Sequence, residues 1–238
     1  MAAAWALPST CPLDGGQMAQ LEAVIAALAG GYAPSAVQGE REISLRHIHD
    51  SLAALEVAAL HGGGLIADLG SGAGFPGIPI AVALPRSRVM LLESRAVRCR
   101  FLERLVRLAR VENATALCMR AESWKEGIGC CDAVLARALA PQPVVLEYAA
   151  PLLALGGVLI DWRGPGAIAA GPSARAAALL GLVRRERVHY RTDSGGLRRY
   201  LDVFEKVSPT PARFPRRPGV ARKRPLGAAA KADGDAAR

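Results

Sequence analysis

Apolar residues change their spacing along this chain, and the change separates an N-terminal part from a longer central part. Over 17–29 and 44–60 they recur every three or four residues, which predicts two amphipathic helices. From residue 65 onward, short apolar runs alternate with helical stretches. Strands are predicted at 65–69, 88–92, 115–119, 132–136 and 158–162, and helices at 76–84, 96–110, 143–155 and 173–182.

Strands that alternate with helices predict a doubly wound, mostly parallel sheet of the Rossmann-like α/β class. Two further strands, 187–191 and 200–207, are joined through Asp193-Ser194-Gly195-Gly196 without a helix, which predicts an antiparallel edge. We expect an N-terminal helical extension at 1–62, a core at 63–207 and a basic C-terminal tail at 208–238. Small residues and prolines predict disorder over 1–16, and the stretch 30–39 is predicted to be a loop.

Composition changes this picture mainly at the C-terminus. The chain has 238 residues and a net charge of +9. Eight of its 30 Lys and Arg residues lie between 206 and 232, a stretch that contains no Asp or Glu. Because Pro and aromatic residues are interleaved with these cations, we favour a polyanion as partner over a merely solvated tail.

The sequence disfavours several other classes of protein. Its five Cys include no C-x-x-C pair and its four His lack the spacing of metal ligands, so we expect no disulfide framework and no metal. The N-terminus lacks the pattern of a signal peptide, and no run of about 18 apolar residues predicts a membrane span. We therefore expect a cytoplasmic protein without a membrane partner.

The strongest chemical signal is Asp68-Leu69-Gly70-Ser71-Gly72-Ala73-Gly74, at the end of the first predicted strand. Glycines let the backbone turn tightly against a ligand, and this position is the ligand crevice of an open α/β sheet. Residues 72–77 also match the dinucleotide fingerprint, but Asp68 would repel a pyrophosphate and Pro76 removes an N–H that could bind it. A sulfonium ligand with an ammonium group suits the acid better, so the pattern favours S-adenosylmethionine.

Further candidate cofactor residues follow the ends of the later strands. Glu93 ends the second strand, where an acid can accept hydrogen bonds from both ribose hydroxyls. Ala121 and Glu122 follow the third strand and would border an adenine ring. Arg137 ends the fourth strand, where it could hold a carboxylate or phosphate as a bidentate fork or form an ordinary salt bridge.

The segment after the fourth strand limits the reaction. Residues 137–141 read Arg-Ala-Leu-Ala-Pro, without the Asn/Asp-Pro-Pro-Tyr run that grips an exocyclic amine and without a Cys to attack a pyrimidine. A ring nitrogen with a free lone pair, such as guanine N7, needs neither tool and no general base. We therefore expect no catalytic acid or base, and catalysis by orientation. Exclusion of these two chemistries leaves ring nitrogens as acceptors without singling out N7.

In these motifs the chain resembles the glucose-inhibited division protein B family, the bacterial 16S ribosomal RNA (guanine-N7)-methyltransferases that act in the 530 loop. The resemblance spans 46–226 and includes Arg46-His47-Ile48-His49-Asp50-Ser51-Leu52 and the run from Gly70 to Pro79. The other matching segments are 92–94, 98–102, 120–122, 136–138, 209–219 and 222–226. One departure lies at 30–45, which lacks the Trp-Asn and Asn-Leu-Thr segment usual in the family.

The resemblance implies that S-adenosylmethionine is contacted by Gly70, Phe75, Glu93, Ser94, Arg95, Ala121, Glu122 and Arg137. It also implies that the tail helps to hold ribosomal RNA, and the tail cations are Arg213, Arg216, Arg217, Arg222, Lys223 and Arg224. The partner would be 16S rRNA in the 30S subunit or an assembly intermediate, and we expect a monomer. Two alternatives stay open: a non-catalytic RNA-binding protein that senses S-adenosylmethionine, and an NAD(P)-dependent oxidoreductase with a fortuitous basic tail.

Overall fold

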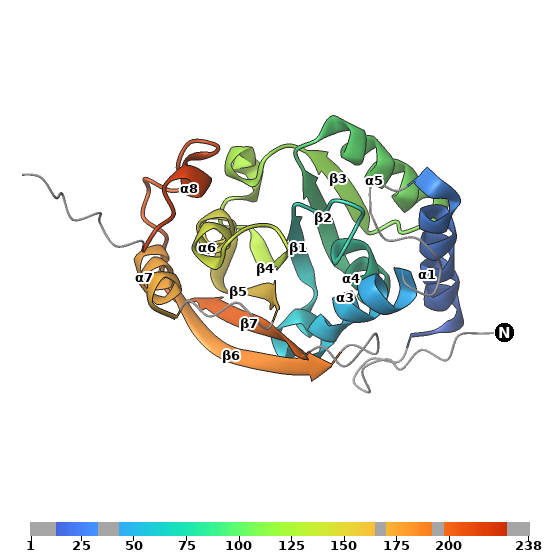
Figure 1. Cartoon of the computed structure of the whole chain (residues 1–238), viewed down its shortest axis with the longest axis horizontal. Helices are drawn as coiled ribbons and strands as arrows, with labels where there is room; N and C mark the ends of the chain where they lie inside the picture. The colour runs from blue at the N-terminus through green and yellow to red at the C-terminus, as the bar shows by residue number, and fades with distance from the viewer. Residues whose placement is uncertain (1–12, 33–42, 165–169, 192–197, 228–238) are drawn as a thin grey trace, which may run out of the picture.

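A seven-stranded sheet forms the centre of the protein, in a computed structural model that describes residues 13–32, 43–164, 170–191 and 198–227 (Figure 1). The strand order is β3-β2-β1-β4-β5-β7-β6. The parallel strands are β1 (Gly64–Leu69), β2 (Ser87–Glu93), β3 (Ala114–Cys118), β4 (Cys131–Arg137) and β5 (Leu153–Arg163). Beyond β5, β7 (Arg198–Lys206) and β6 (Leu182–Arg191) pair antiparallel. The predicted Rossmann-like fold and its antiparallel edge are confirmed.

Helices cover both faces of the sheet. One face carries α1 (Gly15–Ala27), α4 (Gly77–Ala83) and α5 (Ala96–Leu108), and the other carries α6 (Gln142–Ala149) and α7 (Ala170–Leu180). Successive strand residues serve opposite faces, so Ile66 belongs to the first core and Ala67 to the second. Burial on both faces explains why these strands read as continuous apolar runs.

The N-terminal extension differs from its prediction. Helix α1 begins at Gly15 because Asp14 and Gln17 form a capping box, each side chain accepting the other's backbone N–H at 2.8 Å. The single helix predicted over 44–60 is wrong. A π-helical turn (Ser44–His49) leads into the short α3 (Asp50–Leu52), and two 3-10 turns follow (Ala53–Glu56 and Ala58–Gly62), separated by Val57 in an extended conformation. Tertiary contacts of this segment thus override its helical period.

The remaining differences lie at element ends. Helix α6 stops at Ala149 rather than 155, because Pro151 cannot donate a helical N–H, and β5 already begins at Leu153. Predictions for 1–12, for 33–39, for the turn at 193–196 and for the last residues of the tail, 228–238, fall outside the described residues. Residues 208–227 continue past β7 and pack on α6, partly through α8 (Val220–Lys223).

Candidate functional site

The glycine-rich segment turns sharply between β1 and α4. Gly70, Gly72 and Gly74 all have positive φ angles, of 71°, 57° and 98°. The N–H groups of Gly70 and Ser71 both donate to the carbonyl of Leu92, at 2.8 and 3.0 Å, which ties the turn to the end of β2. A Cβ on Gly70 would lie 2.7 Å from Cδ1 of Leu139, whereas one on Gly72 would have 3.7 Å to its nearest neighbour. The turn therefore has room for a methyl group at Gly72 but not at Gly70.

Asp68 lies under this turn and is 1 % exposed. Its Oδ2 accepts the Gly77 N–H at 3.0 Å, which joins the carboxylate to the start of α4. Its Oδ1 has no hydrogen-bond partner in the described part of the chain, and burial raises the pKa of this carboxyl to about 6. A buried acceptor without a partner is unusual in folded proteins. A cationic ligand such as S-adenosylmethionine would satisfy it, so this residue fits the predicted cofactor.

Glu93 also fits its predicted role. Its side chain is 5 % exposed, Oε2 accepts the Gly72 N–H at 3.2 Å, and Oε1 accepts the Arg95 N–H at 2.8 Å. Arg98 Nη1 lies 3.7 Å from Oε2. A carboxylate has about four lone-pair positions, so two remain for the hydroxyls of a ribose. Arg95 contributes its backbone to this arrangement, while its side chain is exposed.

A small cavity of about 70 Å³ opens beside Glu93 at the carboxyl ends of β1, β2 and β3. It brings together four of the predicted residues, Gly70, Ser94, Ala121 and Glu122. The rest of its lining consists of Leu69, Leu92, Met119, Arg120, Leu139, Tyr148 and Arg222. Its position matches the site where an open α/β sheet binds a nucleoside. Tyr148 from α6 and Arg222 from the tail were not predicted to line it.

Arg137 forms the salt bridge that the sequence left open as an alternative to ligand binding. Its Nη1 donates to Asp50 Oδ2 at 2.9 Å, and its Nη2 is 2.8 Å from Nδ1 of His47. The guanidinium lies 5.5 Å from the centre of the Phe75 ring, and His47 stacks on the same ring at 4.7 Å. Burial lowers the pKa of Arg137 and the Asp50 carboxylate opposes that shift. Arg137 and Phe75 therefore meet beside the glycine turn, but Arg137 is already engaged by the N-terminal extension.

Asp50 is the centre of the polar cluster around Arg137 and is 1 % exposed. Besides Arg137, its carboxylate accepts the Tyr190 hydroxyl at 2.6 Å and Arg199 Nη1 at 3.1 Å, and its carbonyl accepts Trp162 Nε1 at 2.8 Å. The extension is thus fastened to β4, β5, β6 and β7 at one point. Asp50, Tyr190 and Arg199 were not predicted as site residues. The segment 46–52 supported the family resemblance, but nothing in its spacing indicates which later strands it contacts.

The tail is folded onto the core near the small cavity. Arg216 makes a bidentate ion pair with Glu147 of α6, with Nε 2.5 Å from Oε1, and Glu147 is 1 % exposed. The Gly219 N–H donates to Glu122 Oε1 at 3.1 Å, and Arg222 Nη2 donates to the Leu139 carbonyl at 3.0 Å. The side chains that remain exposed belong to Arg213, Arg217, Arg222, Lys223 and Arg224. Of the predicted tail cations, Arg216 therefore has a structural partner inside the protein.

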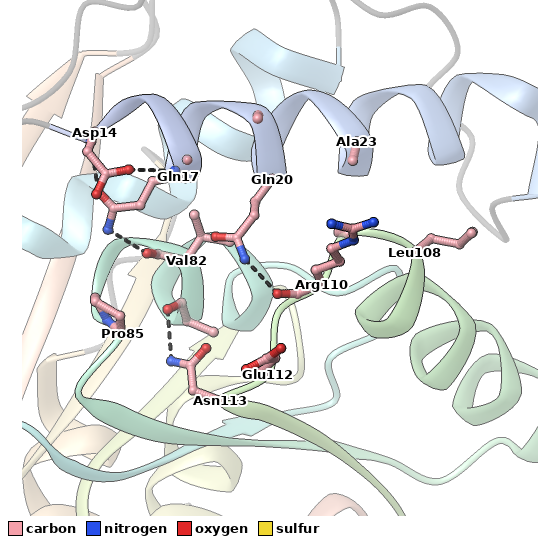
Figure 2. Close-up of a pocket in the computed structure, with 14 residues that line it drawn as sticks. Asp14, Gln17, Gln20, Ala23, Val82, Pro85, Leu108, Arg110, Glu112 and Asn113 are labelled. Atoms are coloured by element: carbon pink, nitrogen blue, oxygen red, sulfur yellow. Dashed lines mark hydrogen bonds between the residues drawn. The ribbon is translucent and has the colours of Figure 1, made fainter.

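A larger cleft of about 720 Å³ lies at the opposite, amino ends of the strands, between α1 and the starts of β2 and β3. Figure 2 shows Gln17 and Gln20 of α1 reaching across it to the carbonyls of Val82 and Arg110, at 2.8 and 2.6 Å. Asn113 holds the far wall by donating to the Ala81 carbonyl at 2.9 Å. None of the predicted site residues lines this cleft. Its polar side chains serve to dock α1.

In the part of the chain that the structure describes, no group of three or more His, Cys, Asp or Glu side chains could hold a metal ion. No helix within the same ranges is long and apolar enough to cross a bilayer.

Comparison with solved structures supports the fold. A putative sarcosine dimethylglycine methyltransferase from Galdieria sulphuraria is 17% identical, with a TM-score of 0.56 over 71% of this chain and 87% of that one. The YcgJ protein from Bacillus subtilis gives the same TM-score of 0.56 at 11% identity, over 68% of this chain and 100% of its own. At such identities the likeness concerns the fold alone.

Comparison of sequences identifies the family. A curated ribosomal RNA small subunit methyltransferase G from Carboxydothermus hydrogenoformans is 40% identical over 82% of this chain and 84% of its own. Its counterpart from Pelotomaculum thermopropionicum is 38% identical over 81% and 82%. The GidB family profile, described as rRNA small subunit methyltransferase G, matches residues 17–178 and confirms the resemblance seen in the motifs. The chain belongs to the rRNA small subunit methyltransferase G family.

Proposed function

We propose that this protein transfers a methyl group from S-adenosylmethionine to N7 of a single guanosine in the 530 loop of 16S ribosomal RNA. S-adenosylmethionine is the cofactor, as the motif from Asp68 to Gly74 predicts. The observation that best supports RNA as the substrate is the contact between Gly219 and Glu122. Through this contact a basic segment lies against the cavity that we propose as the cofactor pocket. The relatives' names support small-subunit rRNA as the substrate.

The residues that would hold the cofactor fall into three groups. Asp68 and the turn at Gly72 would accept its charged amino acid end, and Glu93 its ribose. Ser94, Ala121 and Glu122 would border the adenine. When bound, S-adenosylmethionine supplies an electrophilic methyl group whose departure leaves a neutral thioether. Phe75, which lies beside Arg137, would form one boundary of the cofactor site.

The side chains beside the glycine turn suit an unprotonated ring nitrogen. Guanine N7 has a free lone pair, so no group has to remove a proton, and what the site must supply is orientation. Hydrogen bonds fix the cluster of Arg137, His47 and Asp50, which would give the target base a rigid wall. The segment that follows Arg137 carries neither of the side-chain sets used on amines or pyrimidine carbons. Both features support N7 as the acceptor.

The exposed cations of the tail would hold the RNA backbone. Arg213, Arg217, Lys223 and Arg224 extend from the segment that Arg216 fastens to α6. Phosphate contacts position RNA without reading its sequence, and each neutralised phosphate adds about one unit to the log–log salt slope. We expect the target guanosine to come from an unpaired loop, because there the Hoogsteen edge that carries N7 is accessible. The enzyme would act as a monomer on the 30S subunit or an assembly intermediate.

The test is methyl transfer from labelled S-adenosylmethionine to purified 30S subunits that lack the modification, followed by mapping of the labelled base. A single labelled N7-guanosine in the 530 loop is the expected result. Label at another position would refute the proposed target nucleotide but would still support an rRNA methyltransferase. Cofactor binding without any incorporation, on subunits, precursor particles and naked rRNA alike, would favour the non-catalytic sensor. Family membership removes the reason to prefer an NAD(P)-dependent oxidoreductase.

A further inference from the structure

The cavity that would border the adenine is small in this conformation. Its volume of about 70 Å³ compares with about 300 Å³ at the lower end for small-molecule sites. A nucleoside would bury more of its surface here if a side chain of the lining changed its rotamer.

Part of the lining is held by the core. Leu69 and Leu92 are 1 % exposed on β1 and β2, Tyr148 is 6 % exposed on α6, and the backbone of Gly70 is bonded to β2. Moving any of these would disturb packed strands or helices.

Arg222 is less constrained than these residues, and among the residues that line the cavity it is the one that the tail contributes. It comes from the four-residue helix α8, and its side chain is exposed. Nη2 donates to the Leu139 carbonyl at 3.0 Å, and the guanidinium also interacts with the Tyr148 phenol. Its neighbours Arg216 and Ala221 anchor the segment, so the Arg222 side chain can change its rotamer without loss of the segment's position.

The chemistry of Arg222 suits an adenine ring. A guanidinium is planar, stacks on aromatic faces and donates to ring nitrogens, which act as acceptors. Glu122, its neighbour in the lining, can accept from the exocyclic amine, since a carboxylate is acceptor-only when ionised. Burial raises the pKa of the Tyr148 phenol, so this residue stays neutral beside the cation.

We propose that Arg222 is an additional cofactor-binding residue, which leaves the Leu139 carbonyl when the nucleoside enters and then packs against the adenine. The segment that we propose to hold RNA would thus also complete the cofactor pocket. This inference rests on the proposed position of the cofactor, but not on the identity of the methylated base.

The test is calorimetric titration of the full chain with S-adenosylhomocysteine, which binds without reacting and requires no RNA. We compare the wild type with Arg222→Gln and with Lys223→Gln, which removes the same charge one residue away from the lining. Loss of a charge-assisted contact at a partly exposed position should raise the dissociation constant of Arg222→Gln about tenfold. Lys223→Gln should stay within about twofold of the wild type.

Two results would overturn the proposal. One is an unchanged dissociation constant for Arg222→Gln. The other is an equal loss in both variants, which would indicate a general effect of charge. The melting temperatures of the unliganded variants should match that of the wild type, because Arg222 is exposed, and a lowered value for Arg222→Gln would make its role structural. The result is separate from the proposed function, since misplaced label on the 30S subunit would leave this titration unaffected.

Discussion

The ion pair between Arg216 and Glu147 offers the sharpest test of how the tail is attached. Glu147 is 1 % exposed, whereas about a quarter of the Arg216 side chain, 24 %, is accessible to solvent. In Arg216→Met the buried carboxylate would lose its partner, a change that typically costs about 3–5 kcal/mol. Because water can reach this site, we expect the free energy of unfolding to fall by about 3 kcal/mol for the lost ion pair. The lost hydrogen bond to the Arg224 carbonyl should lower it by about 1 kcal/mol more.

The double variant Glu147→Leu/Arg216→Met separates the ion pair from the rest of the contact. Replacing both partners removes the unpaired charge, so we expect most of the lost stability to return, to within about 1 kcal/mol of the wild type. The assay is urea unfolding followed by circular dichroism, with the slope of each transition compared. A cost below about 1 kcal/mol for Arg216→Met, or an equal cost in the double variant, would contradict the reasoning and favour a tail that is not fastened here.

Four further variants test the glycine-rich turn, Asp68 and the Asp50 cluster. Gly72→Ala should weaken S-adenosylhomocysteine binding in calorimetry with a stability loss of about 1–2 kcal/mol, because its Cβ would make only an ordinary contact of 3.7 Å and the strain lies in the left-handed backbone. Gly77→Ala should instead destabilise the fold, since its Cβ would lie 2.6 Å from Asp68 Oδ2. Asp68 has a pKa raised from 3.8 to about 6, so its contribution to stability is present below pH 4 and is lost as the pH rises through 6. Asp68→Asn should flatten the decline in unfolding free energy between pH 4 and 8 by up to about 3 kcal/mol, and an unchanged profile would contradict this. Asp50→Asn should lower stability by about 3 kcal/mol in urea unfolding and should slow methyl transfer, since it leaves the Arg137 cation poorly paired; full activity would exclude a role for this cluster.

Local patterns predicted which segments would gather at the carboxyl edge of the sheet. Asp68, the glycines and Glu93 belong to short segments at strand ends, and a doubly wound sheet brings such ends to one edge. The structure accordingly places Gly70, Ser94, Ala121 and Glu122 around one cavity. Their contact with the cofactor remains a prediction.

The partners of the charged residues were not predictable in the same way. Arg137 was expected to face a ligand, yet it meets Asp50, which lies 87 residues away in sequence. Arg216 was expected to face RNA, yet it meets Glu147, 69 residues away. A charge pattern shows that cations are present but not which of them a buried carboxylate will engage, because that depends on how distant segments pack.

The sequence by itself determined the α/β fold, the glycine-rich turn after the first strand and the basic character of the C-terminal segment. These properties depend on hydrophobic periodicity, on glycine and on local charge, all of which act over a few residues. Only the tertiary structure decided that the 44–60 segment is broken into short turns, so that Asp50 reaches four strands at once. It also decided that the tail lies against the cofactor pocket through Gly219 and Arg222. The physical reason is that buried polar groups must find partners, and here those partners come from parts of the chain far apart in sequence.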